Sequence, residues 1–429
     1  MRRAVRAFFV VCLLTPAAVI AQDLTAPAPA GQVRVIVTLR DDAKLDSYAS
    51  AFVADERLQD RARFGYHSRS VLGAIMALER QHGFRARAFY SSAIRGFAAT
   101  MTPATAARLA ADPLVRAVEA DDPISLPPTE RAAVESTQIV DWGITKIGAD
   151  QTLAHSGDGT GTVSGVNVYV IDTGVDPTHP DINLVNHVTF VQNEPNADCN
   201  GHGTGVAGII AGRDNDVFTV GVVPGAPVTG VKVLNCDGIT FPSIIVQGID
   251  WVTANAAKPA VANMSLGSLI RIAAVDTAVR NSAASGIFYA LAAGNGNPYN
   301  NNAPLNACTT SPAAVGYSSN GVNGIMTAAA TDEADVEASF SNYGACVDIW
   351  APGVAVNAPW LMAEGGLITA SGTSFSSPYV AGAAAYVLSR LPMLPPWFVE
   401  FLLKVTVDFP GTTSFDGTAV RRLQIRLFQ

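Results

Sequence analysis

The segment Ser371–Gly382 (SGTSFSSPYVAG) decides the fold together with two earlier segments, Val168–Asp176 (VYVIDTGVD) and Gly201–Gly208 (GHGTGVAG). In Val168–Asp176 an aspartate ends an apolar strand. In Ser371–Gly382 a serine opens a helix of small residues, and in Gly201–Gly208 a histidine does so. Functional groups at strand ends and helix starts suit the crevice at the carboxyl edge of a parallel sheet. The three segments therefore predict an α/β fold with a site at that edge.

The chain from Trp142 onward alternates apolar strands with helices. Alternation at this spacing predicts a mainly parallel sheet with helices on both faces. The expected strands are residues 167–171, 227–234, 261–265, 287–293, 324–330 and 346–350. The expected helices are residues 203–211, 243–255, 273–285 and 374–388.

Three side chains in these segments form a complete set for nucleophilic catalysis. Ser374 opens a helix, where backbone N–H groups face the oxygen that becomes negative during attack. His202 can take the serine proton and return it to a leaving amine. Asp172, held at a strand end, can orient the imidazole. Asp172, His202 and Ser374 are therefore the predicted triad.

Each of these residues also has a structural interpretation. A serine at a helix start is commonly an N-cap, and a lone histidine is usually structural or merely exposed. Asp176, His179 and His187 lie nearby but lack the strand-end or glycine-flanked setting. The occurrence of all three motifs in one chain favours catalysis.

The three motifs resemble those of the subtilisin-like serine peptidases, specifically the proteinase K and aqualysin branch. Matching segments run from about Trp142 to the last few residues. The resemblance implies a three-layer, subtilisin-like α/β domain that hydrolyses peptide bonds through an acyl-enzyme intermediate, with no cofactor for the chemistry. It selects Asp172, which precedes Thr-Gly, over Asp176. It also implies that Asn295, in Ala-Ala-Gly-Asn, donates to the oxyanion.

The resemblance further implies that a protein or peptide substrate binds as an added strand in a groove. The residues that it places along this groove are Ser265, Leu266, Gly267, Gly238, Phe241, Ala293 and Gly294. Their small, apolar character predicts a broad preference for apolar or aromatic residues before the scissile bond.

The chain departs from the family pattern at several positions. Gly205 replaces a second histidine, Phe375 and Ser376 replace Met-Ala, and Tyr379 replaces a histidine. The segment at Gly238 is one residue short. None of these changes removes a proton-transfer group. A subtilase-like protein that binds peptides but is catalytically impaired is the alternative function.

The cysteines predict disulfides. Of five, Cys12 lies near the N-terminus, and the other four allow three pairings. The resemblance implies the pairs Cys199–Cys236 and Cys308–Cys346. A zinc site is the alternative, but the chain has no C-x-x-C or Cys-His ligand spacing.

Calcium is a candidate structural ion. The resemblance offers Asp348 as its ligand, together with carbonyl groups of the preceding loop. A surface or turn-capping role for Asp348 is the alternative.

The N-terminal residues 1–21 predict a secretory signal peptide. Arg2, Arg3 and Arg6 precede an apolar run over residues 7–14, and small residues end at Ala21. The run is too short to span a bilayer, so we expect a secreted protein with no membrane attachment after cleavage. The net charge of −8 and the scattered Lys and Arg argue against nucleic acid as a partner.

Residues 32–125 predict a small α+β ferredoxin-like domain. Strands over 33–39, 96–101 and 115–119, a helix near 71–78 and a second helix opened by Thr102-Pro103 indicate the order β-α-β-β-α-β. A generic α+β domain is the alternative. The pattern resembles the inhibitor-type propeptide of the same peptidases, which implies an intramolecular inhibitor.

The proline-bearing linker 126–140 is expected to be exposed and cleavable, and residues 141–429 to form the catalytic domain. Together these features predict a monomeric zymogen that processes itself.

Overall fold

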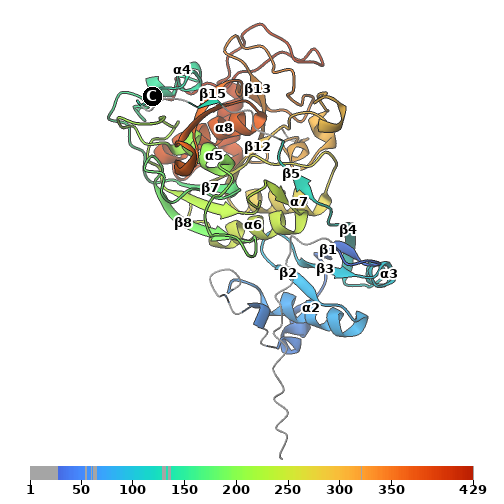
Figure 1. The fold of residues 1–429 in the computed structure, drawn as a ribbon. Helices are drawn as coiled ribbons and strands as arrows, with labels where there is room; N and C mark the ends of the chain where they lie inside the picture. Colours follow the sequence, from blue (N-terminus) through green and yellow to red (C-terminus); the bar gives the residue numbers. More distant parts are fainter. Residues whose placement is uncertain are drawn as a thin grey trace, which may run out of the picture.

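The computed structural model describes residues 28–53, 56–58, 60, 65–127, 132–133, 137–319 and 321–428. The expected signal peptide lies outside these residues. Figure 1 shows a small N-terminal unit, coloured blue, beside a larger α/β domain. Among the described residues, no helix combines the length and the apolar character needed to cross a membrane.

The N-terminal unit has the predicted β-α-β-β-α-β order. Its sheet is antiparallel, with the strand order β2-β3-β1-β4. Its elements are β1 (Val33–Leu39), α2 (Arg69–His82), β2 (Ala86–Tyr90), β3 (Gly96–Met101), α3 (Pro103–Ala110) and β4 (Val115–Ala120). Thr102 caps α3 as expected, since its hydroxyl oxygen accepts the N–H of Thr105 at 3.2 Å.

Both faces of this small sheet are buried. Val35 and Val37 of β1 pack with helices α2 and α3 of the same unit. Ile36, which points the other way because side chains alternate along a strand, packs with the larger domain. On this face the neighbouring strand β2 contacts helix α6 (Pro242–Asn255) of the larger domain. The N-terminal unit is therefore docked through its sheet.

The larger domain is built on a seven-stranded sheet in which every pairing is parallel. The strand order is β14-β13-β12-β11-β7-β9-β8. The strands are β7 (Asn167–Asp172), β8 (Leu184–Thr189), β9 (Val228–Lys232), β11 (Ala260–Met264), β12 (Ile287–Ala292), β13 (Ile325–Thr331) and β14 (Ile349–Pro352). The parallel α/β prediction is confirmed, although the sequence patterns missed the edge strand β8 and placed β14 three residues too early.

Helices cover both faces of this sheet, as expected. One core contains α5 (His202–Ala211) and α8 (Thr373–Arg390), and the other contains α6 and α7 (Ala273–Ala284). The remaining helices are α4 (Trp142–Lys146) and α9 (Pro396–Val405). The patterns did not predict α9, which packs against α8, β12 and β13.

Short strands join the linker to the larger domain. Strand β5 (Ile124–Ser125), which follows β4 of the small unit, pairs with β10 (Ile239–Thr240) of the larger domain. β6 (Ala132–Ala133) extends the β-hairpin formed by β15 (Val356–Pro359) and β16 (Leu367–Ala370). The linker is thus anchored on both sides of its proline-bearing part.

Two disulfides close loops in the larger domain. Cys199 is bonded to Cys236, and Cys308 to Cys346, at sequence separations of 37 and 38 residues. These are the pairs that the resemblance implies. Glu194 lies close to the first pair, but oxidised cysteines offer no thiolate to a metal, so this cluster does not form the alternative zinc site.

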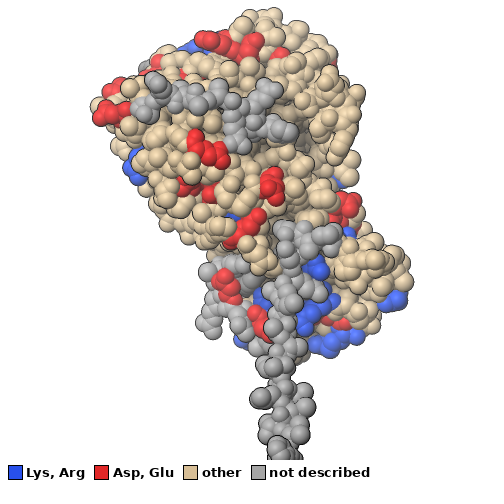
Figure 2. All heavy atoms as spheres, viewed as in Figure 1, with Lys and Arg blue, Asp and Glu red and all other residues tan. Residues whose placement is uncertain are grey.

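Charged side chains are interspersed on the larger domain. On the face drawn in Figure 2, the larger domain shows scattered acidic side chains and few basic ones between wide uncharged areas, and basic side chains gather over the N-terminal unit. No continuous basic stripe crosses the described part of the larger domain on this face.

Candidate active site

Asp172 and His202 are joined by a short hydrogen bond. Asp172 is the last residue of β7 and His202 the first residue of α5. His202 Nδ1 lies 2.7 Å from Asp172 Oδ1, which also accepts the N–H of Thr173 at 2.7 Å. Both side chains are buried. This bond holds the ring in one orientation and leaves Nε2 as its basic nitrogen.

The surroundings of His202 favour its charged form. Burial by itself lowers the pKa of His202, but the charge of Asp172 and its hydrogen bond raise it, and the nearby charge of Asp198 raises it further. The net pKa of His202 lies above the ordinary value of 6.5. The site can therefore stabilise the imidazolium that forms when His202 accepts a proton.

Ser374 lies in the first turn of α8, which packs against α5. Its side chain is 6% exposed, and its hydroxyl donates to the carbonyl oxygen of Ser265 at 3.2 Å. The ring of the next residue, Phe375, lies 5.9 Å from the ring of His202. In the described part of the chain no hydrogen bond joins Ser374 to His202, and a bond between nucleophile and base commonly tightens only when substrate binds.

Asn295 is positioned by the residue before the serine. Its Oδ1 accepts both the N–H and the hydroxyl of Thr373, each at 2.8 Å. Because Oδ1 is held in this way, Nδ2 is the end of the amide that can serve a ligand. A Cβ at Gly372 would lie 3.1 Å from this Nδ2, so the glycine leaves room beside the donor. The arrangement suits a donor to a developing oxyanion.

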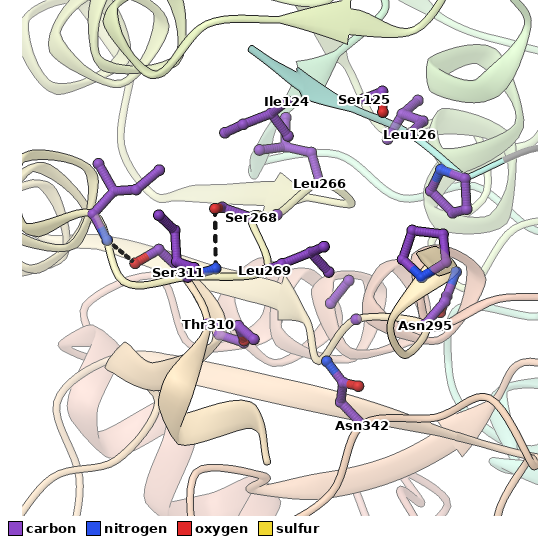
Figure 3. A pocket seen from close by; sticks show the side chains of 18 of the residues that line it. Ile124, Ser125, Leu126, Leu266, Ser268, Leu269, Asn295, Thr310, Ser311 and Asn342 are labelled. Atoms are coloured by element: carbon purple, nitrogen blue, oxygen red, sulfur yellow. Dashed lines mark hydrogen bonds between the residues drawn. The ribbon is translucent and has the colours of Figure 1, made fainter. Parts of the chain in front are cut away.

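A cavity of about 560 Å³ opens beside Ser374 and Asn295. Ser265, Leu266 and Gly267 line one side after β11, and Ala293 and Gly294 line the other after β12. Figure 3 shows Leu266 and Leu269 facing this space from one wall, with Asn295 on the opposite side. The lining near Ser374 combines small or apolar residues with a few polar ones, namely Asn295, Asn342, Thr373 and Ser265.

Gly238 and Phe241 lie beside the cavity rather than in its lining. The carbonyl oxygen of Gly238 accepts the N–H of Leu126 at 2.9 Å, which continues the pairing of β5 with β10. Ile124 and Leu126 pack against the hydrophobic cluster that contains Phe241 and Leu266. Figure 3 shows Ile124, Ser125 and Leu126 along the cavity. Residues 124–126, where the N-terminal unit passes into the linker, are therefore the added strand in this structure.

Asn342 is a site residue that the sequence patterns missed. Its Oδ1 accepts the N–H groups of Gly296 and Leu305, at 3.1 and 2.8 Å, and its Nδ2 donates to the carbonyl oxygen of Ala293 at 2.8 Å. It thereby fixes the wall that carries Asn295. The available signal was its place in Ser-Asn-Tyr-Gly shortly before Cys346.

Further lining residues also escaped sequence reasoning. They follow Gly267 or flank the disulfide loop, and they include Ser268, Leu269, Ile270, Thr310 and Ser311. The loop 268–272 has no motif of its own, so only its packing against residues 310–311 identifies it.

Two departures from the family pattern have clear structural roles. The hydroxyl of Tyr379 donates to Asp141 Oδ1 at 2.7 Å, which ties α8 to the residue that caps α4. Gly205 faces Pro359 and Trp360, and a Cβ there would lie 3.2 Å from the carbonyl oxygen of Pro359. No hydrogen bond joins the Tyr379 side chain to the triad among the described residues, and Gly205 has no side chain that could make one.

Asp348, the candidate calcium ligand, does not fit a metal ion. Its Oδ1 lies 2.7 Å from the ammonium of Lys404, and its Oδ2 accepts the N–H of Thr327 at 2.7 Å. A Cβ at Gly316 would collide with Oδ2, so the loop backbone lies directly against the carboxylate. The position expected for an ion is taken by the chain itself.

Comparisons with known proteins agree with this geometry. Residues 163–422 match the Subtilase family, and residues 34–127 match the Peptidase inhibitor I9 family. The chain is 38% identical over 350 residues to the alkaline serine exoprotease A of Vibrio alginolyticus, covering 80% of this chain and 60% of that relative's length. It is 38% identical over 319 residues to an extracellular serine proteinase of Thermus sp. (strain Rt41A), covering 73% of this chain and 71% of the relative.

A solved structure supports the same assignment. The crystal structure of a cold adapted subtilisin-like serine proteinase is 37% identical to this chain, with a TM-score of 0.57, and the match covers 66% of this chain and 98% of the other. The family match covers more than half of the chain, and it includes β7, α5, β12 and α8. The protein therefore belongs to the subtilase family of serine peptidases and carries an inhibitor-type domain before its peptidase domain.

Proposed function

We propose that the chain is a secreted serine endopeptidase in which Ser374 is the nucleophile, His202 the general base and acid, and Asp172 the residue that orients His202. The hydrogen bond between His202 Nδ1 and Asp172 Oδ1 is the observation that carries this proposal. His202 Nε2 takes the proton of Ser374 as its oxygen attacks the peptide carbonyl. It then delivers that proton to the leaving amine, and water releases the acyl group in a second round.

Asn295 Nδ2 and the N–H of Ser374 donate to the oxygen that becomes negative. The bonds from Thr373 to Asn295 Oδ1 hold the amide before substrate arrives. A preorganised donor stabilises the transition state without reorganisation at the moment of reaction, so Asn295 contributes to turnover more than to substrate affinity.

Substrate binds in the place that residues 124–126 now occupy. The pairing of Ile124–Ser125 with β10 supports an extended peptide as the added strand. Backbone hydrogen bonds of this kind bind many sequences, and apolar pockets select among them. The apolar walls at Leu266, Leu269 and Ala293 support a broad preference for apolar or aromatic residues before the scissile bond.

The zymogen processes itself within the linker. Strand β5 pairs with β10 and strand β6 pairs with β16, so the chain between Leu126 and Ala132 connects two paired strands. Gln138 and Ile139 are held by Asp216 and Phe218 through backbone hydrogen bonds. We place the cut between Leu126 and Gln138, which separates a propeptide domain (32–125) from a catalytic domain (141–429) that acts as a monomer outside the cell.

Fluorophosphonate labelling combined with casein hydrolysis tests the proposal. We expect the purified mature protein to hydrolyse casein and to be labelled at Ser374. The variant Ser374→Ala should lose both signals, keep its circular dichroism spectrum and remain at its pro-form length. A catalytically impaired, peptide-binding protein would give neither hydrolysis nor labelling in the parent. Labelling that persists in Ser374→Ala would assign the nucleophile to another serine.

A further inference from the structure

A buried ion cluster lies far along the chain from the triad, at the loop before β13. Its members are Asp348, which precedes β14, and Glu400 and Lys404 on α9. Lys404 Nζ lies 2.7 Å from Asp348 Oδ1 and 2.6 Å from Glu400 Oε1, and it donates to the carbonyl oxygen of Gly321 at 3.0 Å. An ammonium has three donors, and these three acceptors use all of them.

The two carboxylates are tied to the loop through their other oxygens. Asp348 Oδ2 accepts the N–H of Thr327, and Glu400 Oε2 accepts the N–H groups of Asn323 and Gly324 at 2.6 Å each. The side chains of Asp348 and Glu400 are 6% and 0% exposed, whereas that of Lys404 is 16% exposed. Buried carboxylates are costly unless a cation and hydrogen bonds satisfy them.

The loop carbonyl groups that could complete a metal site already have partners. Ala313 O accepts the hydroxyl of Thr327 at 2.7 Å, and Val315 O accepts the side-chain amide of Asn323 at 2.8 Å. Gly321 O is the acceptor of Lys404 itself. Calcium takes six to eight oxygen ligands, and this loop offers few that are free to turn toward it.

We propose that the ammonium of Lys404 is a built-in cation for Asp348 and Glu400, so that this subtilase binds no divalent cation at Asp348. The Lys404 ammonium, which is part of the chain, takes the place of a calcium ion that could dissociate. Stabilisation by this cluster is therefore independent of free calcium, whereas a bound ion would stabilise the fold only in proportion to its concentration above the dissociation constant.

Thermal unfolding of the full pro-form tests this inference, with Ser374→Ala as the parent to prevent self-digestion. The melting temperature is measured in EGTA and in millimolar CaCl₂ for the parent and for Asp348→Asn. We expect the calcium-induced shift to be the same in both proteins, even if Asp348→Asn is less stable. A shift that is smaller in Asp348→Asn would show that calcium binds at Asp348 and would overturn the proposal.

A double-mutant cycle tests the ammonium itself. Lys404→Met keeps most of the side-chain volume but removes the charge, and it should lower the melting temperature in EGTA by at least about 5 °C because two buried carboxylates lose their cation. In the Asp348→Asn background the same substitution should lower the melting temperature by clearly less. An equal loss in both backgrounds would show that Lys404 does not act as the cation of Asp348 and would overturn the proposal.

Lys146→Met is the matched control. Lys146 pairs with Asp335 at 2.9 Å, but Asp335 keeps Arg422 as a second partner. Its removal leaves no carboxylate without a cation, so we expect a change of about 2 °C or less. Because none of these measurements uses peptidase activity, their outcome is separate from that of the proposed catalytic function.

Discussion

Asp121, which belongs to the N-terminal unit, caps helix α6 of the peptidase domain with its carboxylate. Its Oδ1 accepts the N–H of Ser243 and its Oδ2 the hydroxyl of Ser243, each at 2.8 Å, in the first turn of α6. Arg34 lies 2.9 Å from the same Oδ2, and both charged side chains are buried. Glu119 likewise accepts the N–H groups of Ala273 and Ala274, at 2.9 Å each, at the start of α7.

Substitution of Asp121 should therefore weaken the hold of the cleaved propeptide. Asp121→Ala removes the buried ion pair with Arg34 and the cap of α6, which together cost roughly 3–5 kcal/mol. We expect a shorter lag between disappearance of the full-length band and the rise of peptidase activity. Asp42→Ala, an exposed carboxylate on the same unit, is the control and should leave the lag unchanged. An unchanged lag in Asp121→Ala would argue against the capping role.

The pH profile should reflect the raised pKa of His202. The imidazole must be neutral to accept the serine proton, so kcat/KM falls as pH drops through the pKa of His202 in the free enzyme. Since that pKa lies above 6.5, the acid limb should lie above pH 6.5, and activity should persist on the alkaline side.

The variant Asp172→Asn removes the cause of this shift. Its acid limb should move to lower pH, and its kcat should fall by roughly 10⁴-fold because the tautomer is no longer fixed. Stopped assays with a short peptide substrate across pH 5–10 measure both effects. An acid limb that stays in place in Asp172→Asn would assign the titration to another group.

Loss of the Asn295 amide should reduce turnover. For Asn295→Ala we expect kcat to fall by about 10²–10³-fold with little change in KM, because its hydrogen bond strengthens as the oxyanion forms. Asn297→Ala changes a loop asparagine that caps Tyr299 and should stay within about twofold of the parent. A rise in KM at constant kcat in Asn295→Ala would instead indicate a role in substrate binding.

A methyl group at Gly294 should displace the cavity wall that carries Asn295. Gly294 has a φ of +104°, and a Cβ there would collide with the side-chain amide of Asn342. The variant Gly294→Ala must shift the backbone beside Asn295, and misplacement of a catalytic group by about 1 Å costs on the order of 10²-fold in rate. Steady-state kinetics of the mature variant test this, and full activity would contradict it.

Removal of the second disulfide should destabilise the peptidase domain. The variant Cys308→Ser/Cys346→Ser opens a loop of 38 residues, which corresponds to about 3–4 kcal/mol in the chain-entropy model. Denaturant unfolding in the Ser374→Ala background measures the change. Non-reducing peptide mapping of the parent should recover Cys199 with Cys236 and Cys308 with Cys346, and a peptide that joins Cys199 to Cys308 would contradict the assignment.

Sequence patterns predicted the elements whose side chains carry the strongest signals. The strand that ends at Asp172 and the helices that begin at His202 and Thr373 have apolar runs and motif residues at their ends, and the structure places them within a residue or so. The order of elements in the small unit was predicted, but the bounds of β2 were not, because the first three residues of its sequence ARAFY are small or charged and show no clear alternation.

The parts that escaped prediction depend on contacts between distant segments. β8 has exposed residues at Val185 and Asn186 and is recognisable as a strand only by its pairing with β9. Asn342 gains its role from backbone groups near residues 293–305, and Lys404 from a carboxylate 56 positions earlier, since 404 minus 348 is 56. A single sequence carries no local pattern for such partners.

The order of the elements along the chain governs when peptidase activity can arise. Asp172, His202 and Ser374 are spread over 203 positions, counted from 172 through 374, and Ser374 stands in the last part of the chain. The N-terminal unit, which occupies the groove through Ile124–Leu126, is synthesised before any of them. Because domains generally form in the order of synthesis, the inhibitor is present before the nucleophile exists. The order of elements along the chain therefore supplies the inhibitor-type unit before the helix that carries Ser374 in each newly made molecule.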